Sequence, residues 1–302
     1  MTSPDRSLPP LQLVTAAVAM APMLLLACPA CISWADRRLR RDWLGAVPLW
    51  AIAMGPIVLA ALLRPTGRAL VVSVWGAYLL VPLIIAVTTR APLSPPRLLA
   101  LFLGFALPLS LPVLPPLGWA FSAGGPQIPA GIVPANLGLS IVLIYRPTSG
   151  FGYRLRLPRR EVGLAVAAFG AFGALAIPLG WLSGFLLPGL GVRTPYVALA
   201  GMGIIFLCIA IPEELAFRGL LQQGLERLLG TRAGLFGAAL IFGLFHLGHP
   251  PAPNWRYCLL ASLAGLAYGG VYQRTRSITA SALTHALVDW TWFVLFAGRG
   301  IP

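Results

Sequence analysis

Long apolar runs separated by short polar stretches dominate the pattern along the chain. Several runs reach roughly 20 residues, the length that a helix needs to cross the hydrocarbon core of a bilayer. The pattern predicts an all-α, polytopic transmembrane helix bundle with about 10 (8–10) membrane segments. The segments are expected at 11–34, 44–63, 69–89, 98–119, 130–145, 161–182, 197–223, 232–248, 257–273 and 277–298.

The segment 130–145 is short, and the arginines test whether it crosses the membrane. Cytoplasmic loops of membrane proteins carry an excess of basic residues. With ten spans, 15 arginines fall in the odd-numbered loops and 6 in the even-numbered loops and the two termini. With nine spans this bias disappears. The arginines therefore favour ten spans with both termini outside, in a multi-pass protein of the cell (inner or plasma) membrane.

Composition narrows the class of protein further. Hydrophobic residues make up 58% of the 302 residues, charged residues make up 10%, and the mean hydropathy is +0.84. A soluble domain is about a quarter charged, so a soluble protein is excluded. All 22 basic residues are arginine, and with abundant Ala, Gly and Pro this suggests a bacterial coding sequence. Because the arginines flank apolar segments, the net charge of +14 predicts a lipid bilayer as partner and no nucleic acid.

Ionisable residues gather inside the apolar segments of the second half. Glu213, Glu214 and Asp289 lie within these segments, as do His246 and His285. Such groups are costly and rare at membrane depth, and they normally face a partner or a polar cavity. Their concentration is the main functional signal of the sequence.

The stretch from Thr194 to Gly230 is too long for a simple span. Its 37 residues would extend about 55 Å as a continuous helix, at 1.5 Å per residue. Pro212 is predicted to break or kink this helix, so that Glu213 and Glu214 lie in the first turn of the next piece. Free N–H groups there favour anions, and broken helices at membrane depth line wet cavities. We therefore expect a polar site at this point.

The two adjacent glutamates differ in their helical neighbours. Glu214 and Arg218 are four residues apart on one face, which favours a structural ion pair between them. Glu213 lies about 100° around the helix, on a face that instead carries Phe217 and Leu220. Glu213 is therefore free to act as a general base.

The histidines lie on the two other helices of the expected site. From a turn near 230–231, Glu213 is about 17 residues up one arm and His246 about 16 up the other. An antiparallel hairpin would place these two side chains at similar depth, which favours a functional role for His246. His285 and Asp289 share a face. They either satisfy each other or, as we favour, face the same cavity as Glu213 and His246.

Other reactive residues give weaker signals. Cys28 and Cys31 have CxxC spacing, which without a second pair is weak evidence for zinc or redox chemistry. Residues 25–28 faintly resemble a lipoprotein cleavage site, but we favour a first membrane span. His249 precedes two prolines near a segment end and is expected at the membrane interface.

Three short motifs follow one another on separate segments: Glu213-Glu214-Leu215-Ala216-Phe217-Arg218, Phe242 through His246, and His285 through Asp289. They resemble the EExxxR, FxxxH and HxxxN or HxxxD pattern of the CPBP family of intramembrane proteases. That family includes the type II CAAX prenyl endopeptidases and the bacterial Abi-type proteins. The resemblance implies a CPBP-like catalytic membrane domain over 161–302, with its motifs within 197–298. Residues 1–160, with about five segments, form an N-terminal transmembrane region without a recognised motif.

The resemblance also implies a role for each matched residue. Glu213 and His246 would activate a water molecule for attack on a peptide carbonyl. His285, with Asp289, would stabilise the oxyanion that forms. Structural support of the site would come from Glu214, Arg218 and Phe242.

Position 289 departs from the commoner family pattern. Many members have Asn there, which can donate a hydrogen bond to an oxyanion. Asp289 can donate only when it is protonated, as in an apolar cavity, and an ionised Asp289 would instead orient His285. Both roles stay open.

A zinc-dependent version of the same protease is an alternative. Two glutamates and two histidines, with Asp289 nearby, could bind Zn²⁺ and leave a position open for water. The ligands would be Glu213, Glu214, His246 and His285. No HExxH pair is present to supply adjacent ligands, so we favour glutamic chemistry with no cofactor.

The sequence therefore predicts an intramembrane endopeptidase. Its substrate is expected to be a membrane-embedded or lipid-anchored protein or peptide, since the ionisable residues lie within membrane segments. Two other classes stay open. One is a non-catalytic immunity or scaffold protein of the membrane, and the other is an ion-coupled transporter that uses the same buried residues as a relay.

Overall fold

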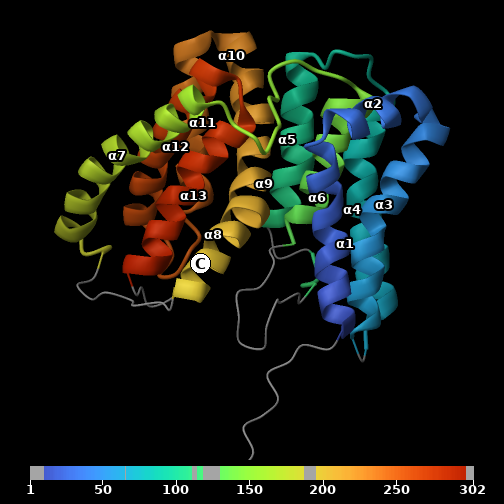
Figure 1. The fold of residues 1–302 in the computed structure, drawn as a ribbon, viewed down its shortest axis with the longest axis horizontal. Coiled ribbons are helices and arrows are strands. Elements are labelled where there is room, and N and C mark those ends of the chain that lie inside the picture. The colour runs from blue at the N-terminus through green and yellow to red at the C-terminus, as the bar shows by residue number, and fades with distance from the viewer. Residues whose placement is uncertain (1–9, 65, 111–113, 118–129, 187–194, 297–302) are drawn as a thin grey trace, which may run out of the picture. The chain divides into compact units, whose positions relative to one another are not determined.

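We describe the chain from a computed structural model over residues 10–64, 66–110, 114–117, 130–186 and 195–296. The regular structure of these residues is helical and contains no strand, which confirms the all-α prediction. The chain forms two compact units, residues 1–93 with 103–148 and residues 94–102 with 149–302 (Figure 1). The predicted division into functional domains at residue 160 stays a prediction.

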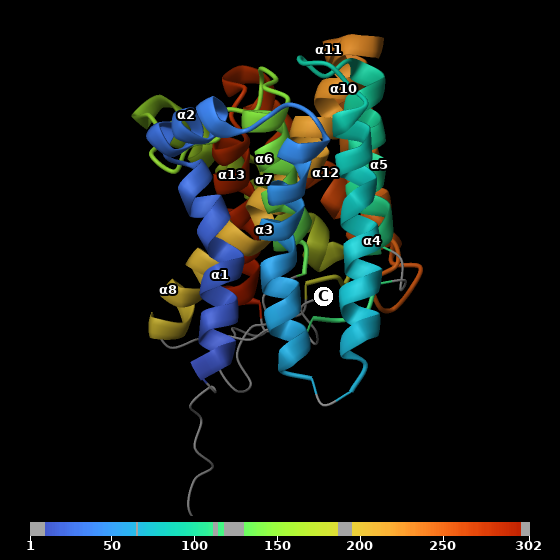
Figure 2. The same cartoon turned by 90° about the vertical axis from the view of Figure 1, so that its right-hand side faces the viewer.

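The first unit is built of apolar helices and one short polar helix. Its helices are α1 (Pro10–Leu26), α2 (Pro29–Arg38), α3 (Trp43–Leu62), α4 (Arg68–Val87), the second half of α5 (Pro95–Ser110), α6 (Ile132–Ser140) and the π-helical η1 (Ile141–Tyr145). α3 packs against α4, while α1 and α6 pack against α3 and against each other (Figure 2).

The predicted segment 11–34 is not one helix. α1 ends at Leu26, and α2 begins at Pro29 and runs at 90° to it. Cys28 before the proline has an extended backbone (φ −96°, ψ 115°), because the proline ring disfavours helical conformation in the residue it follows. α2 also ends in the polar run Asp36 to Arg38, and none of its residues is buried.

Arg146 is the buried charged residue among the described residues of the first unit, with 6% of its surface exposed. Its Nε donates to the carbonyl of Ala86 (2.9 Å), and its Nη2 donates to those of Val87 (3.3 Å) and Arg41 (3.1 Å). Its Nη1 donates to the carbonyl of Tyr145 (3.1 Å). Two of these acceptors, Ala86 and Val87, are the last two residues of α4, whose carbonyls lack the regular i→i+4 partner. Arg146 therefore caps α4.

The second unit contains all three motifs. Its helices are the first half of α5, α7 (Arg159–Leu182), α8 (Pro195–Ile204), η2 (Ile205–Ala210), α9 (Ile211–Glu214), η3 (Leu215–Gln222), α10 (Gln223–Leu229), α11 (Thr231–Phe245), α12 (Trp255–Thr275) and α13 (Ile278–Leu295). α12 packs against α11, α13 and α7, and α13 also contacts α9 and η2 (Figure 1).

A single helix of 33 residues runs from Val197 to Leu229. The predicted break at Pro212 is therefore wrong, and Glu213 does not lie at the start of a new helix. The π-helical η2 and η3 flank α9 on either side. Their wider i→i+5 turns accommodate the missing N–H and the ring of a proline that would interrupt a regular α-helix.

The turn predicted near 230–231 is confirmed. Gly230 separates α10 from α11 with a φ of +86°, a conformation that glycine adopts without the steric cost of a side chain. α10 and η3 both pack against α11. The two arms therefore form the expected helical hairpin.

Among the described residues, four helices are long and apolar enough to cross a membrane: Trp43–Leu62, Arg68–Val87, Arg159–Leu182 and Val197–Leu229. The count becomes five if the bent pair Val14–Leu26 and Pro29–Arg38 forms one span. Shorter apolar helices occupy Pro95–Ala106, Ile132–Tyr145 and Thr231–Phe245. These helices indicate a membrane protein, but the prediction of about ten membrane segments is not confirmed.

Candidate active site

Glu214 is completely buried at the end of α9, and both of its oxygens are engaged. Oε2 accepts a hydrogen bond from Arg218 Nε (2.9 Å) and another from Ser281 Oγ. Oε1 lies 2.9 Å from Nδ1 of His285. The predicted ion pair with Arg218 is confirmed. Glu214 links the long helix to α13 and has no carboxylate oxygen left for chemistry.

His285 is held on three sides. While Nδ1 faces Glu214, Nε2 lies 3.2 Å from Asp289 Oδ2 and 3.9 Å from Glu213 Oε2. The imidazole also stacks on the ring of Tyr268, with centroids 4.6 Å apart and planes inclined by 13°. The structure therefore brings His285, Asp289 and both glutamates into one cluster.

The start of α13 is anchored by its own side chains. Ser277 caps the helix by accepting a hydrogen bond from the N–H of Ala280 (3.1 Å), and its Oγ lies 3.0 Å from the carbonyl of Gly152. Thr279 Oγ1 accepts from the N–H of Arg154 (3.1 Å). His285 lies about two turns further along, so its position depends on these contacts.

Glu213 lies in a different environment from its neighbour Glu214. Its side chain is 35% exposed, yet its Oε2 is buried and has no hydrogen-bond partner among the described residues. The ring of His285, 3.9 Å away, is its ionic neighbour. Glu213 is the glutamate of the pair with an oxygen available for a substrate or a water molecule.

His246 follows α11 directly and is oriented by its own helix. Its Nδ1 lies 2.8 Å from the carbonyl of Phe242. A carbonyl only accepts, so Nδ1 carries the proton and Nε2 is left as the acceptor nitrogen. The rings of Phe242 and Tyr257 lie 4.7 Å from the His246 ring, and His249 packs on Tyr257 at 5.2 Å.

His246 does not contact the carboxylate cluster. No hydrogen bond or ion pair joins it to Glu213 within the described residues, but the helix packing gives their register. Phe217 of η3 packs on Phe242 of α11, with centroids 4.9 Å apart. Phe217 is four residues after Glu213, and Phe242 is four before His246. Because the helices are antiparallel, Glu213 and His246 lie one turn beyond this contact in the same direction.

Arg218 is fully buried, and much of its surroundings is aromatic. Its guanidinium carbon lies 5.0 Å from the ring centroid of Phe242 and 5.8 Å from that of Tyr268. Nη1 and Nη2 have no hydrogen-bond partner in the described part of the chain. Phe242 thus touches Arg218 as well as His246 and Phe217.

Two members of the cluster were missed by the sequence analysis. Ser281 is four residues before His285, so the helical spacing of α13 could have indicated that the two share a face. Tyr268 lies on α12, on which no motif was recognised, and its aromatic side chain has no polar spacing pattern around it. Nothing in the local sequence distinguishes it from a packing residue.

The residues considered as zinc ligands do not form a ligand set. No group of three or more His, Cys, Asp or Glu side chains is placed to hold a metal ion among the described residues. Glu214 is occupied by Arg218, Ser281 and His285. We therefore derive no chemical step through a metal, and the lack of a cofactor stays a prediction.

Comparison with known proteins agrees with the motifs. Residues 194–291 match the family model described as type II CAAX prenyl endopeptidase Rce1-like. No curated protein and no solved structure matches the chain. Residues 194–291 are thus similar to an Rce1-like domain. This similarity is consistent with a CPBP-family intramembrane protease and supports a CAAX-type intramembrane endopeptidase in general.

Proposed function

We propose that this protein hydrolyses a peptide bond of a membrane-embedded or lipid-anchored protein or peptide, with Glu213 as general base. The observation that carries the proposal is the difference between two adjacent glutamates. Glu214 has both oxygens engaged, whereas Glu213 keeps a buried oxygen without a hydrogen-bond partner among the described residues, 3.9 Å from His285. A base needs a lone pair that no other hydrogen bond occupies, in a site that is shielded from bulk water.

Glu213 and His246 activate the water molecule in this proposal. Glu213 takes one proton from the water, while Nε2 of His246 accepts a hydrogen bond from the other O–H and so orients the molecule. The water oxygen then bonds to the peptide carbonyl carbon, and the carbonyl oxygen becomes an oxyanion. When the carbon–nitrogen bond breaks, the proton held by Glu213 passes to the leaving amine.

His285 stabilises the oxyanion. Its Nδ1 donates to Glu214 and its Nε2 faces Asp289, and with a proton on each nitrogen the ring is an imidazolium. The substrate oxygen replaces Asp289 as the partner of Nε2 when its charge develops. Asp289 thus orients the ring in the resting enzyme, and Glu214 with Arg218 and Phe242 supports it.

The substrate class follows from the place of the site. The acids lie on helices of a membrane protein, so the scissile bond is in a segment anchored in or on the bilayer. The matched family model is named for CAAX prenyl endopeptidases, which makes a prenylated CAAX peptide the first probe. The sequence around the cleaved bond is then determined from the fragments found in membranes that contain the protein.

Comparative membrane proteomics tests the proposal. Membranes with the wild-type protein are compared with those containing Glu213→Gln, which keeps the size of the side chain. The control is Glu161→Gln, since Glu161 pairs with Arg154 at the start of α7. Cleavage fragments should be present in the wild type and the control and absent in Glu213→Gln, at equal protein abundance.

Three outcomes would contradict the proposal. Identical fragments in all three membranes would show that Glu213 is not a catalytic base. Loss of fragments only in parallel with loss of the protein would favour an immunity or scaffold role. Proton or ion flux through liposomes that depends on Glu213, without cleavage, would favour a transporter.

A further inference from the structure

Four buried polar residues follow one another at four-residue spacing on the long helix: Glu214, Arg218, Gln222 and Glu226, with 0%, 0%, 0% and 9% of their surfaces exposed. On a regular α-helix each step of four residues turns the side chain by about 40°, and three steps turn it by about 120°. Turns of the π-helical η3, which lies between the first and last of them, hold more residues and reduce this rotation. The row can therefore stay on the buried side of the helix.

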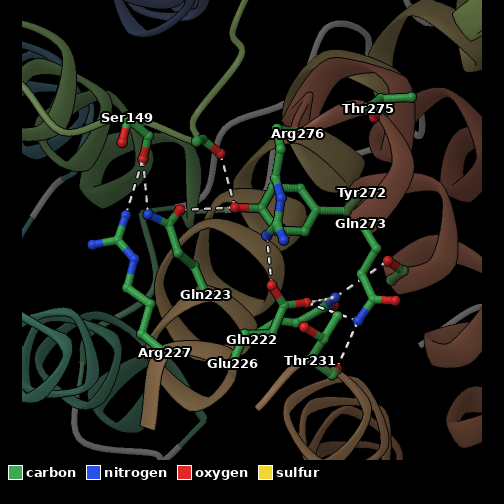
Figure 3. A network of polar contacts seen from close by, with 12 residues as sticks. Ser149, Gln222, Gln223, Glu226, Arg227, Thr231, Tyr272, Gln273, Thr275 and Arg276 are labelled. Carbon is green, nitrogen blue, oxygen red and sulfur yellow. Dashed lines mark hydrogen bonds and ion pairs between the residues drawn. The ribbon is translucent and has the colours of Figure 1, made fainter.

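The row reaches the surface at Glu226. Its Oε1 accepts from Nε2 of Gln222 (2.8 Å) and of Gln273 (2.9 Å), and its Oε2 accepts from Nη1 of Arg276 (Figure 3). The side chain of Arg276 is 45% exposed. At its other end the row reaches His285 through Glu214. A line of polar groups thus connects the rim of the second unit with the candidate active site.

The row is interrupted between Arg218 and Gln222. Nη1 and Nη2 of Arg218 and Oε1 of Gln222 are buried and have no hydrogen-bond partner among the described residues. The orientation of the Gln222 amide is fixed, since its Nε2 donates to Glu226 and to the carbonyl of Gly269 (3.2 Å). Exchanging the amide nitrogen and oxygen would place two acceptors against each other.

Buried donors without a partner on one turn of the helix are thus followed by a buried acceptor without a partner on the next turn. Side chains four residues apart lie about 5–6 Å from each other at Cβ, which leaves room for a small bridging molecule. Buried polar atoms are almost always hydrogen-bonded to protein or ordered water, and at membrane depth an unmet group costs several kcal/mol. The guanidinium needs an acceptor and Oε1 needs a donor. An anion could serve only the guanidinium, whereas water serves both.

We propose that a buried water molecule accepts from the Arg218 guanidinium and donates to Gln222 Oε1, and so closes the row. Gly269 bounds the site, because a Cβ at this position would lie 2.6 Å from Gln222 Oε1. Gln222 is then a positioning residue, which acts through the water on Arg218 and through Arg218 on Glu214 and His285. The water site itself does not depend on peptide-bond hydrolysis.

A high-resolution structure of the full chain in lipid nanodiscs tests the water directly. The expected result is density within hydrogen-bond distance of both an Arg218 Nη and Gln222 Oε1. An empty site, or a direct Arg218–Gln222 hydrogen bond, would overturn the proposal. This measurement needs no substrate, so it succeeds or fails independently of the proposed protease activity.

The positioning role is tested with Gln222→Met against the matched control Gln223→Met. Gln223 is also buried, and it contacts Tyr272 and Ser149 outside the row (Figure 3). Both variants should lose thermal stability. Only Gln222→Met should lose the water density. On a cleaved peptide it should lower kcat by about tenfold with KM unchanged, which corresponds to 1.36 kcal/mol of transition-state stabilisation.

Equal loss of kcat in Gln222→Met and Gln223→Met would show that Gln222 contributes only to packing, and it would overturn the positioning role. Density that persists unchanged in Gln222→Met would show that Gln222 does not hold the water. If Gln222→Met does not fold, Gly269→Ala is the second variant, because its methyl group is forced against Oε1. Unchanged water density in a folded Gly269→Ala protein would also count against the site.

Discussion

Two arginines are buried among the described residues, one in each unit, and their hydrogen bonds differ. Arg146 donates from all three of its nitrogens to backbone carbonyls and has no acid partner. Arg218 donates from Nε to Glu214, while both Nη atoms lack a hydrogen-bond partner in the described residues. The first arrangement completes a helix end. The second balances a buried carboxylate and leaves the two Nη atoms without a partner among the described residues.

The comparison distinguishes a buried charge that completes a helix end from a buried charge that belongs to the candidate active site. Backbone carbonyls, two of them at the end of α4, accept from every nitrogen of Arg146. A buried carboxylate is costly unless it is paired and hydrogen-bonded, so Glu214 at this position calls for another reason. Its contacts to His285 and Ser281 supply one. The pair with Arg218 therefore also holds Glu214 in place against α13, the helix that carries His285.

The largest expected effect is on stability. Arg218→Met leaves Glu214 buried without its cation, which should lower the free energy of unfolding by about 3–5 kcal/mol. Adding Glu214→Gln removes the stranded charge and should restore most of that loss. Arg146→Met leaves only carbonyls unpaired, and should cost about 1–3 kcal/mol. Thermal unfolding in detergent measures all three.

Glu214→Gln added to Arg146→Met is the matched control, and it should bring no recovery. If it restored Arg146→Met as well as it restores Arg218→Met, the recovery would be unrelated to a pair between positions 214 and 218. The contrast between the two buried arginines would then fail.

The next largest effect is expected on the rate of cleavage, and it should distinguish two histidines that follow α11. His246→Ala should lower kcat by about 10²-fold, since it removes the hydrogen bond that orients the attacking water in the proposed mechanism. His249→Ala should leave the rate within a few-fold, because His249 packs on Tyr257 outside the carboxylate cluster. Equal losses in the two variants, measured on one peptide, would argue against a distinct role for His246.

A smaller effect is expected at position 289. Asp289→Asn keeps an oxygen to face His285 Nε2 and adds an amide donor, so cleavage should persist within about tenfold. Asp289→Ala removes the 3.2 Å contact and should slow the reaction more than Asp289→Asn does. A rate series for the three proteins decides this. If Asn were as damaging as Ala, the carboxylate charge itself would be required.

The smallest effects concern the helix caps of the two units. Asp42 caps α3 by accepting from the N–H of Gly45 (3.2 Å), and Ser277 caps α13. Replacing either with Ala should cost about 1 kcal/mol of stability. Only Ser277→Ala should also slow cleavage, because α13 carries His285. A rate change of the same size in Asp42→Ala would mean that the two units are not separable in function.

The sequence predicts the parts of this protein that follow from local spacing. The Glu214–Arg218 pair and the turn at Gly230 needed only helical periodicity and a glycine. The path through Pro212 could not be predicted, because π-helical turns depend on the packing of the whole helix and not on the proline alone. The bend at Cys28 could not be predicted from the hydrophobic pattern, because apolar residues continue past it.

Contacts between distant segments were also outside the reach of the sequence. Arg146 was counted as a loop arginine, and only the fold brings the carbonyls of Ala86 and Arg41 to its guanidinium. Tyr268 reaches His285 from another helix without any motif. Such contacts depend on how helices pack, which one sequence does not specify.

Cleavage by the purified protein in nanodiscs tests the central claim most directly. Wild-type protein, Glu161→Gln and Glu213→Gln are incubated with a prenylated CAAX peptide and with membrane peptides identified from proteomics, with and without a chelator. The account predicts the same cleavage by wild type and Glu161→Gln, unaffected by the chelator. Glu213→Gln should be slower by at least about 100-fold, with an unchanged unfolding midpoint. Cleavage by folded Glu213→Gln at the wild-type rate would contradict the account.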